Sequence, residues 1–173
     1  MVGRDRARSR RVPERAVAVT TIRSATAADA GALANLRWEF RSGKNAPIET
    51  REAFLARCES WMRTELTSSA SWRAWLAEQD GAVVGQVWVH LIQKVPNPAA
   101  ERERHMYLSN LYVRPEARGG VGTRLLEAAL EWAVSQHVDR VVLWPTDRSR
   151  PLYLRHGFTA DVDLLELELE TRG

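Results

Sequence analysis

Cysteine is nearly absent from this chain. The single residue, Cys58, cannot form an intramolecular disulfide, and it falls within a helical pattern without an evident base beside it, which favours an inert thiol over a nucleophile. Histidine is also sparse, and no two residues show the spacing of a metal site: the four are His90, His105, His137 and His156. The sequence therefore predicts no metal centre.

Long apolar runs are missing as well. No segment is apolar over the length that a bilayer span requires, and the N-terminal stretch lacks the apolar core of a secretory signal. These absences predict a soluble, cytoplasmic protein.

Basic residues are concentrated at the N-terminus. Residues 1–15 hold six Arg against Asp5 and Glu14, a net charge of +4, while the whole chain of 173 residues carries +3. This stretch has no apolar run, so we expect a disordered tail followed by one domain over residues 16–173. Nucleic-acid binding through the tail is the weaker alternative, because the tail has no aromatic residues.

Hydrophobic periodicity and turn residues predict a mixture of helices and strands. We expect strands at 16–24, 108–113, 141–144 and 163–170, helices at about 26–41, 50–66 and 122–137, and a short helix capped by Ser149 and closed by Gly157. Asp80-Gly81 lies between two further strand-like runs and predicts a tight antiparallel hairpin. On its second strand, apolar residues alternate with Gln86, Trp88 and His90, a face that could line a polar cleft.

The strand at 108–113 is followed by a glycine-rich loop and then at once by a helical pattern. Free backbone N–H groups at a helix N-terminus favour an anion, and glycines let a phosphate approach the main chain. A P-loop is excluded because Gly122 is followed by Thr123 and Arg124, and the dinucleotide motif lacks its third glycine. The alternative is an ordinary strand-to-helix connection.

Two segments carry a resemblance to a known family. They are Leu111-Tyr112-Val113-Arg114-Pro115-Glu116-Ala117-Arg118-Gly119-Gly120-Val121-Gly122 and Ser149-Arg150-Pro151-Leu152-Tyr153-Leu154-Arg155-His156-Gly157-Phe158. Together with the order of the elements, they make residues 16–170 similar to the GNAT superfamily of acetyl-CoA-dependent N-acetyltransferases. This resemblance implies an α/β (α+β) fold, in which helices flank both faces of a mixed, mostly antiparallel sheet.

The resemblance also implies site residues. The glycine loop would cradle the pyrophosphate of coenzyme A, the main chain of Leu111 and Val113 would pair with the pantetheine arm, and Tyr153 would protonate the departing thiolate. The implied cofactor-binding set is Leu111, Tyr112, Val113, Arg118, Gly119, Gly120, Val121, Gly122, Thr123, Thr146 and Ser149. The alternative for Tyr153 is a packing role in the short helix.

The chain departs from the family pattern at two positions. Ala117 stands where Gln or Arg is usual, with Arg118 one residue later, and Thr146 stands where Asn is often found. The backbone N–H groups of the loop are independent of both changes. The family does not fix the general base, for which Glu39 and His105 are candidates, alongside His90, Tyr107 and a water-holding Asn110.

These inferences predict an N-acetyltransferase that moves an acetyl group from acetyl-CoA directly to an amine in a ternary complex. The acceptor stays open among small amines, amino acids, aminoglycoside-like antibiotics and protein N-termini. The alternative from another class is a non-catalytic module that binds or senses acyl-CoA. Family analogy alone suggests a homodimer.

Overall fold

The computed structural model describes residues 19–43, 47–99, 103–160, 165–167 and 169. Within them the elements follow in the order β1 (Thr20–Ser24), α1 (Ala30–Ser42), α2 (Arg51–Ser68), β2 (Trp72–Gln79), β3 (Ala82–Gln93), β4 (Arg104–Val113), α3 (Val121–Ser135), β5 (Arg140–Val142) and α4 (Arg150–Arg155). Two 3-10 turns precede α1 and α3, at Ala27–Asp29 and Pro115–Ala117. The predicted element order is therefore confirmed as far as α4.

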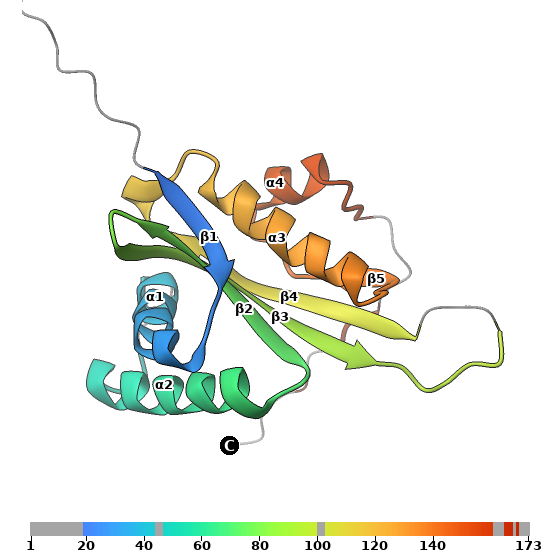
Figure 1. Cartoon of the computed structure of the whole chain (residues 1–173), viewed down its shortest axis with the longest axis horizontal. Coiled ribbons are helices and arrows are strands. Elements are labelled where there is room, and N and C mark those ends of the chain that lie inside the picture. Colours follow the sequence, from blue (N-terminus) through green and yellow to red (C-terminus); the bar gives the residue numbers. More distant parts are fainter. Residues whose placement is uncertain (1–18, 44–46, 100–102, 161–164, 168, 170–173) are drawn as a thin grey trace, which may run out of the picture.

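The described strands form one sheet in the order β1-β2-β3-β4-β5. Adjacent strands of this sheet pair antiparallel, except that β4 and β5 run parallel. Helices α1 and α2 cover one face and α3 covers the other (Figure 1). The predicted fold class, with a mixed and mostly antiparallel sheet between helices, is confirmed.

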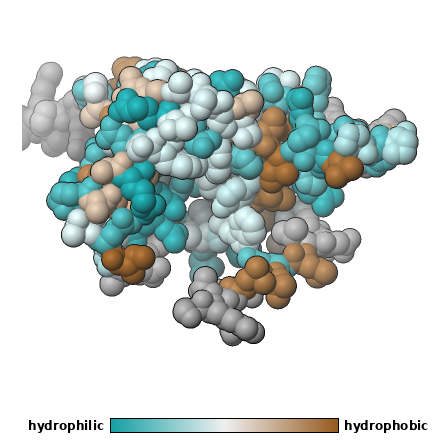
Figure 2. Space-filling model, turned by 90° about the horizontal axis from the view of Figure 1, so that it is seen from below, coloured by the Kyte–Doolittle hydropathy of each residue, from teal (hydrophilic) through white to brown (hydrophobic). Residues whose placement is uncertain are grey.

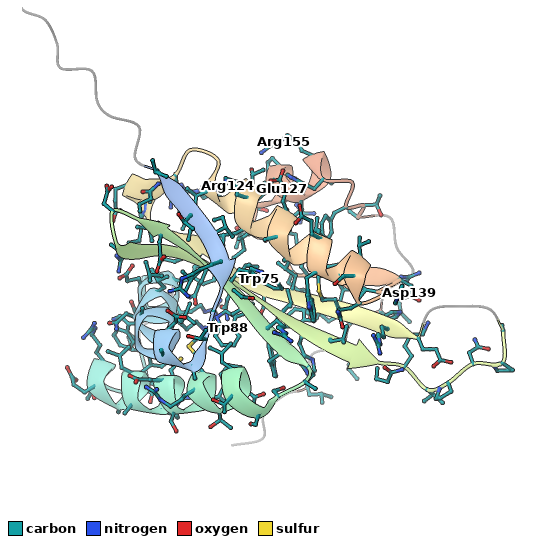
Figure 3. All side chains as sticks on the ribbon, viewed as in Figure 1. Trp75, Trp88, Arg124, Glu127, Asp139 and Arg155 are labelled. Carbon is teal, nitrogen blue, oxygen red and sulfur yellow. The ribbon has the colours of Figure 1, made fainter. Side chains whose placement is uncertain are left out.

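The alternation of side chains along the strands builds two cores, one on each face of the sheet. Trp75 packs on the α3 side, where its ring lies 5.8 Å from that of Trp132. Trp88 is 1% exposed and packs under α1 and α2, 5.6 Å from Trp61 (Figure 3). The sheet is thus held from both sides, and its central strands are buried.

The Asp80-Gly81 hairpin is confirmed, since both residues have positive φ, at 50° and 77°. The expected polar cleft on the second strand is wrong. Gln86 is fully buried beside Trp88, whose indole N–H donates to the Gln86 Oε1 over 3.0 Å, because α1 and α2 cover this face. The amide nitrogen of Gln86 has no hydrogen-bond partner among the described residues.

Two predicted strand boundaries need correction. The first strand begins at Thr20, with Val19 outside it, and residues 16–18 lie outside the described part, as does the tail at 1–15. The last strand, expected at 163–170, is not formed at residues 165–167 and 169. Its leucines are 79–96% exposed there, so the apolar side of the Leu/Glu alternation has nothing to pack against. On the face seen in Figure 2, apolar residues lie in separate patches.

None of the described helices combines the length and the apolar character that a bilayer span requires.

Strands β3 and β4 and helix α3 pack closely around Gly85, and a substitution there tests this packing. A Cβ added at Gly85 would lie 3.1 Å from the Tyr112 carbonyl oxygen and 3.2 Å from Leu125. We expect Gly85→Ala to lower the free energy of unfolding in urea by about 1–3 kcal/mol through overpacking. Gly43→Ala is the control, because nothing lies within 4 Å of its added Cβ. Equal stability of the two variants would contradict this packing.

Candidate active site

A β-bulge interrupts β4 near its end. The pairing with β3 shifts between Trp88, opposite Ser109, and Gln86, opposite Tyr112, so two residues of β4 face one of β3. One of the two is Asn110, whose φ of 54° is in the left-handed region. Asn tolerates this conformation better than most residues do. The bulge therefore re-aims the side chains that follow it on β4.

The outer edge of β4 is free over this same stretch. Strand β5 pairs with it only at His105, Met106 and Tyr107, and within the described part of the chain no strand pairs with that edge at residues 108–113. Leu111, the second residue of the bulge, packs toward the α3-side core, whereas Tyr112 after it faces α1 and stacks on Phe40 at 5.3 Å. The unpaired edge offers main-chain donors and acceptors to an extended ligand.

The glycine loop follows at once. Gly119 and Gly120 have φ of 113° and 94°, and nothing lies within 4 Å of a Cβ added at either. The first intrahelical bond of α3 runs from the Arg124 N–H to the Gly120 carbonyl (3.1 Å), so the N–H groups of the three residues before Arg124 have no acceptor in the helix. This open cradle of free N–H groups fits a phosphate group, in agreement with the sequence.

Side chains around this loop contribute less. Ala117 is 3% exposed and ends the 3-10 turn, while Arg118 is exposed beside the glycines. Thr123 lies in the first turn of α3 and is half-buried. The main chain, more than any side chain, thus defines the cradle.

Helix α4 brings Tyr153 to this region of the molecule. Leu152 of α4 lies 3.9 Å from a Cβ added at Gly122, so α4 packs against the first turn of α3. Tyr153 is 7% exposed, stacks edge-on against Phe158 at 5.5 Å, and lines a cavity of about 570 Å³ between β5 and α4. Tyr153 is thereby fixed in position by packing.

Thr146 and Ser149 bond to each other at the start of α4. The Thr146 N–H donates to the Ser149 hydroxyl over 2.9 Å, and the two hydroxyls lie 3.0 Å apart. Ser149 occupies the N-cap position of α4, but its side chain accepts no hydrogen bond from the backbone N–H groups of the first turn, so the predicted side-chain cap is not formed. The pair orders the turn that leads into Tyr153.

Burial governs the acidity of Tyr153. It raises the pKa of the phenol from 10 to about 12, against a smaller opposing effect of a hydrogen bond with Ser149. The phenol therefore stays protonated throughout the physiological range.

Each of the two candidate bases lies beside another charged side chain. Glu39 on α1 accepts two hydrogen bonds from Arg114, at 2.7 and 2.9 Å. His105 lies 3.2 Å from Asp139, at the end of β4 opposite the glycine loop. The structure places Glu39 beside the last residues of β4 and does not bring the two bases together.

Sequence reasoning missed Arg37 of α1 as a candidate site residue. The Arg37 guanidinium donates a hydrogen bond to the Asn110 side chain in the bulge. Nearby, Tyr107 packs edge-on against Trp144, with ring centroids 5.2 Å apart. No local pattern marks these contacts, because they join residues distant in sequence across the end of the sheet.

A comparison with known families decides the assignment. The model of the Acetyltransferase (GNAT) family matches residues 32–158. The chain belongs to this family. This GNAT acetyltransferase is thus an enzyme, and the expected resemblance is confirmed. No curated protein sequence matches the chain significantly.

Solved structures support the fold of this GNAT acetyltransferase. A predicted acetyltransferase with acetyl-CoA from Clostridium acetobutylicum is 22% identical, with a TM-score of 0.71 over 87% of this chain and 96% of that one. A GCN5-related N-acetyltransferase from Ralstonia eutropha has the same identity and TM-score over 87% and 99%. Aminoglycoside N-acetyltransferase AAC(6')-Iy in complex with CoA is 16% identical, with a TM-score of 0.67 over 92% and 99%.

The raised pKa of Tyr153 predicts a loss of stability at alkaline pH. A tyrosine in the unfolded chain loses its proton near pH 10, whereas Tyr153 in the folded chain loses it near pH 12. The contribution of the protonated phenol to the free energy of unfolding is therefore complete below pH 10 and is lost between pH 10 and 12. We expect Tyr153→Phe to remove that fall, as measured by urea unfolding over a pH series. A difference in the free energy of unfolding between wild type and Tyr153→Phe that stays constant from pH 8 to 12 would contradict the raised pKa of Tyr153.

Proposed function

We propose that this acetyltransferase transfers the acetyl group of acetyl-CoA directly to a primary amine in a ternary complex. The observation that carries the proposal is the junction of two features, the free edge of β4 at residues 108–113 and the open glycine cradle that follows it. Similar folds have been solved with acetyl-CoA and with CoA, which supports the choice of donor.

Acetyl-CoA supplies an activated thioester when bound. The N–H groups of Val121, Gly122 and Thr123 bind its pyrophosphate at the N-terminus of α3, where the helix dipole adds to their attraction. The main chain of Leu111 and Val113 pairs with the extended arm along the free edge of β4 and orients the carbonyl. This chain therefore contributes mainly positioning, for which no covalent enzyme intermediate is needed.

Tyr153 acts on the leaving group. Its pKa of about 12 lies above that of a thiol, about 8.5, so the phenol donates a hydrogen bond to the developing thiolate and need not surrender its proton completely. Thr146 and Ser149 hold the turn that positions it. Glu39 and His105 stay the candidate bases for the acceptor ammonium.

If the glycine loop binds acetyl-CoA, adding one methyl group to a loop glycine should weaken that binding. Gly120→Ala forces a Cβ onto a backbone with φ of 94° at the cradle, and we expect the affinity for acetyl-CoA to fall about tenfold or more in calorimetric titration. Gly81→Ala is a matched control, because Gly81 also has positive φ and open space around it but lies in the β2–β3 hairpin. Equal acetyl-CoA affinity of the two variants would argue against the cradle.

Kinetics separate an enzyme from a binding module. We expect Tyr153→Phe to lower kcat about 100-fold, because the departing thiolate loses its hydrogen-bond donor, while the dissociation constant of acetyl-CoA stays within about twofold of wild type. Release of free thiol with a panel of amines measures the rate. Wild-type protein that binds acetyl-CoA but acetylates no amine would instead indicate the non-catalytic acyl-CoA module.

A further inference from the structure

Several arginine side chains around α1 and α2 are paired with carboxylates, whereas the half-buried Arg37 is not. Arg23 bonds Asp29 and Glu78, Arg57 bonds Glu49, Arg63 bonds Glu59, and Arg114 bonds Glu39. Arg37 is half-buried, yet within the described ranges no carboxylate lies within ion-pairing distance of it. The fold therefore leaves a cation without a counter-ion on the α1 side of β4.

The surroundings of Arg37 do not compensate its charge. Its hydrogen-bond acceptor is the neutral Asn110 side chain, and the charged side chain with the largest electrostatic effect on it is another cation, Arg41. Burial is the main effect on the Arg37 guanidinium and lowers its pKa, with Arg41 acting in the same direction. A charge removed from water without a partner is costly, and an anion that binds there would offset the cost.

The position of Arg37 in the fold indicates which molecule would carry this anion. Its guanidinium contacts Asn110 in the bulge, next to Leu111, whose main chain holds the acetyl donor in the proposed function. One guanidinium carries five N–H donors in a fork that matches a carboxylate, so the bond to Asn110 leaves donors available. An anionic group held there lies close to the attacking amine.

We propose that Arg37 binds a carboxylate of the acceptor, and that the substrates are small amines with a carboxylate a few bonds from the amine, of which free α-amino acids are the simplest. This inference rests on the proposed acetyl transfer. Polycationic acceptors are disfavoured because Arg37 and Arg41 repel them. The acceptor expected for this chain therefore differs in charge from that of the structurally similar aminoglycoside N-acetyltransferase.

The test compares acceptors that carry a carboxylate with acceptors that lack one. Acetyl transfer is measured with a mixture of the α-amino acids, with the matching mixture of their amides, and with an aminoglycoside. We expect kcat/KM to be highest for the amino acids, and Arg37→Gln to lower it about 10- to 100-fold for them while changing the amides less than threefold. Arg63→Gln, which removes an exposed Arg paired with Glu59 on α2, is the matched control and leaves both rates unchanged.

A second readout does not depend on turnover. A mixture of N-acetyl amino acids, the products, should raise the melting temperature of wild-type protein, whereas their neutral amides should not, and Arg37→Gln should abolish the shift. Without ligand, Arg37→Gln should melt no lower than wild type, because it removes an uncompensated buried charge.

The outcomes distinguish this inference from the proposed function. Equal rates for amino acids and amides, or an equal loss for both in Arg37→Gln together with a lowered melting temperature, would make Arg37 a structural support of the bulge and overturn the inference alone. Wild-type protein that binds no acetyl-CoA and acetylates no acceptor of any class would overturn the proposed function. In that case, a missing melting shift with N-acetyl amino acids would overturn the carboxylate site as well.

Discussion

The extra residue in β4 is the constraint on which the site depends. A bulge bends its strand and turns the following side chains, and this one lies just beyond the last β4–β5 pair, at Tyr107. As a result, Leu111 packs toward α3, Tyr112 stacks under α1, and the outer edge of β4 is free immediately before the glycine loop. A ladder continued along both edges of β4 would leave no main chain available for a ligand.

The two cores hold this strained stretch in place. Trp75 and Trp132 pack on one side of the sheet and Trp88 on the other, so that β3, the partner of the bulged strand, is buried on both faces (Figure 3). A left-handed Asn costs conformational energy and persists where its surroundings fix it. Arg37 of α1 donates a hydrogen bond to this Asn110, so the contact joins α1 to the bulge of β4.

Local chemistry made much of this predictable. The Asp80-Gly81 turn, the glycine loop and the helix that begins at Val121 each follow from residues adjacent in sequence, and the structure has all three. The bulge and the Arg37 contact could not be predicted, because Arg37 and Asn110 are 73 residues apart and neither carries a local signature. The strand expected at 163–170 is not formed at the described residues 165–167 and 169, for the related reason that alternation alone does not supply a neighbouring strand.

The positive potential has a different origin at the two ends of the candidate site, which are the N-terminus of α3 and the α1 side of β4. The N-terminus of α3 attracts an anion mainly through N–H groups and a helix dipole, with the exposed Arg118 beside the glycines. On the other side of β4 the positive charge is that of one half-buried guanidinium, Arg37, which has no carboxylate partner among the described residues. The main chain suits any phosphate of the right size, whereas a fixed guanidinium fork discriminates by the position of a carboxylate. Under the proposed function, donor recognition is therefore a property of the backbone, and the proposed acceptor selectivity is a property of a single side chain.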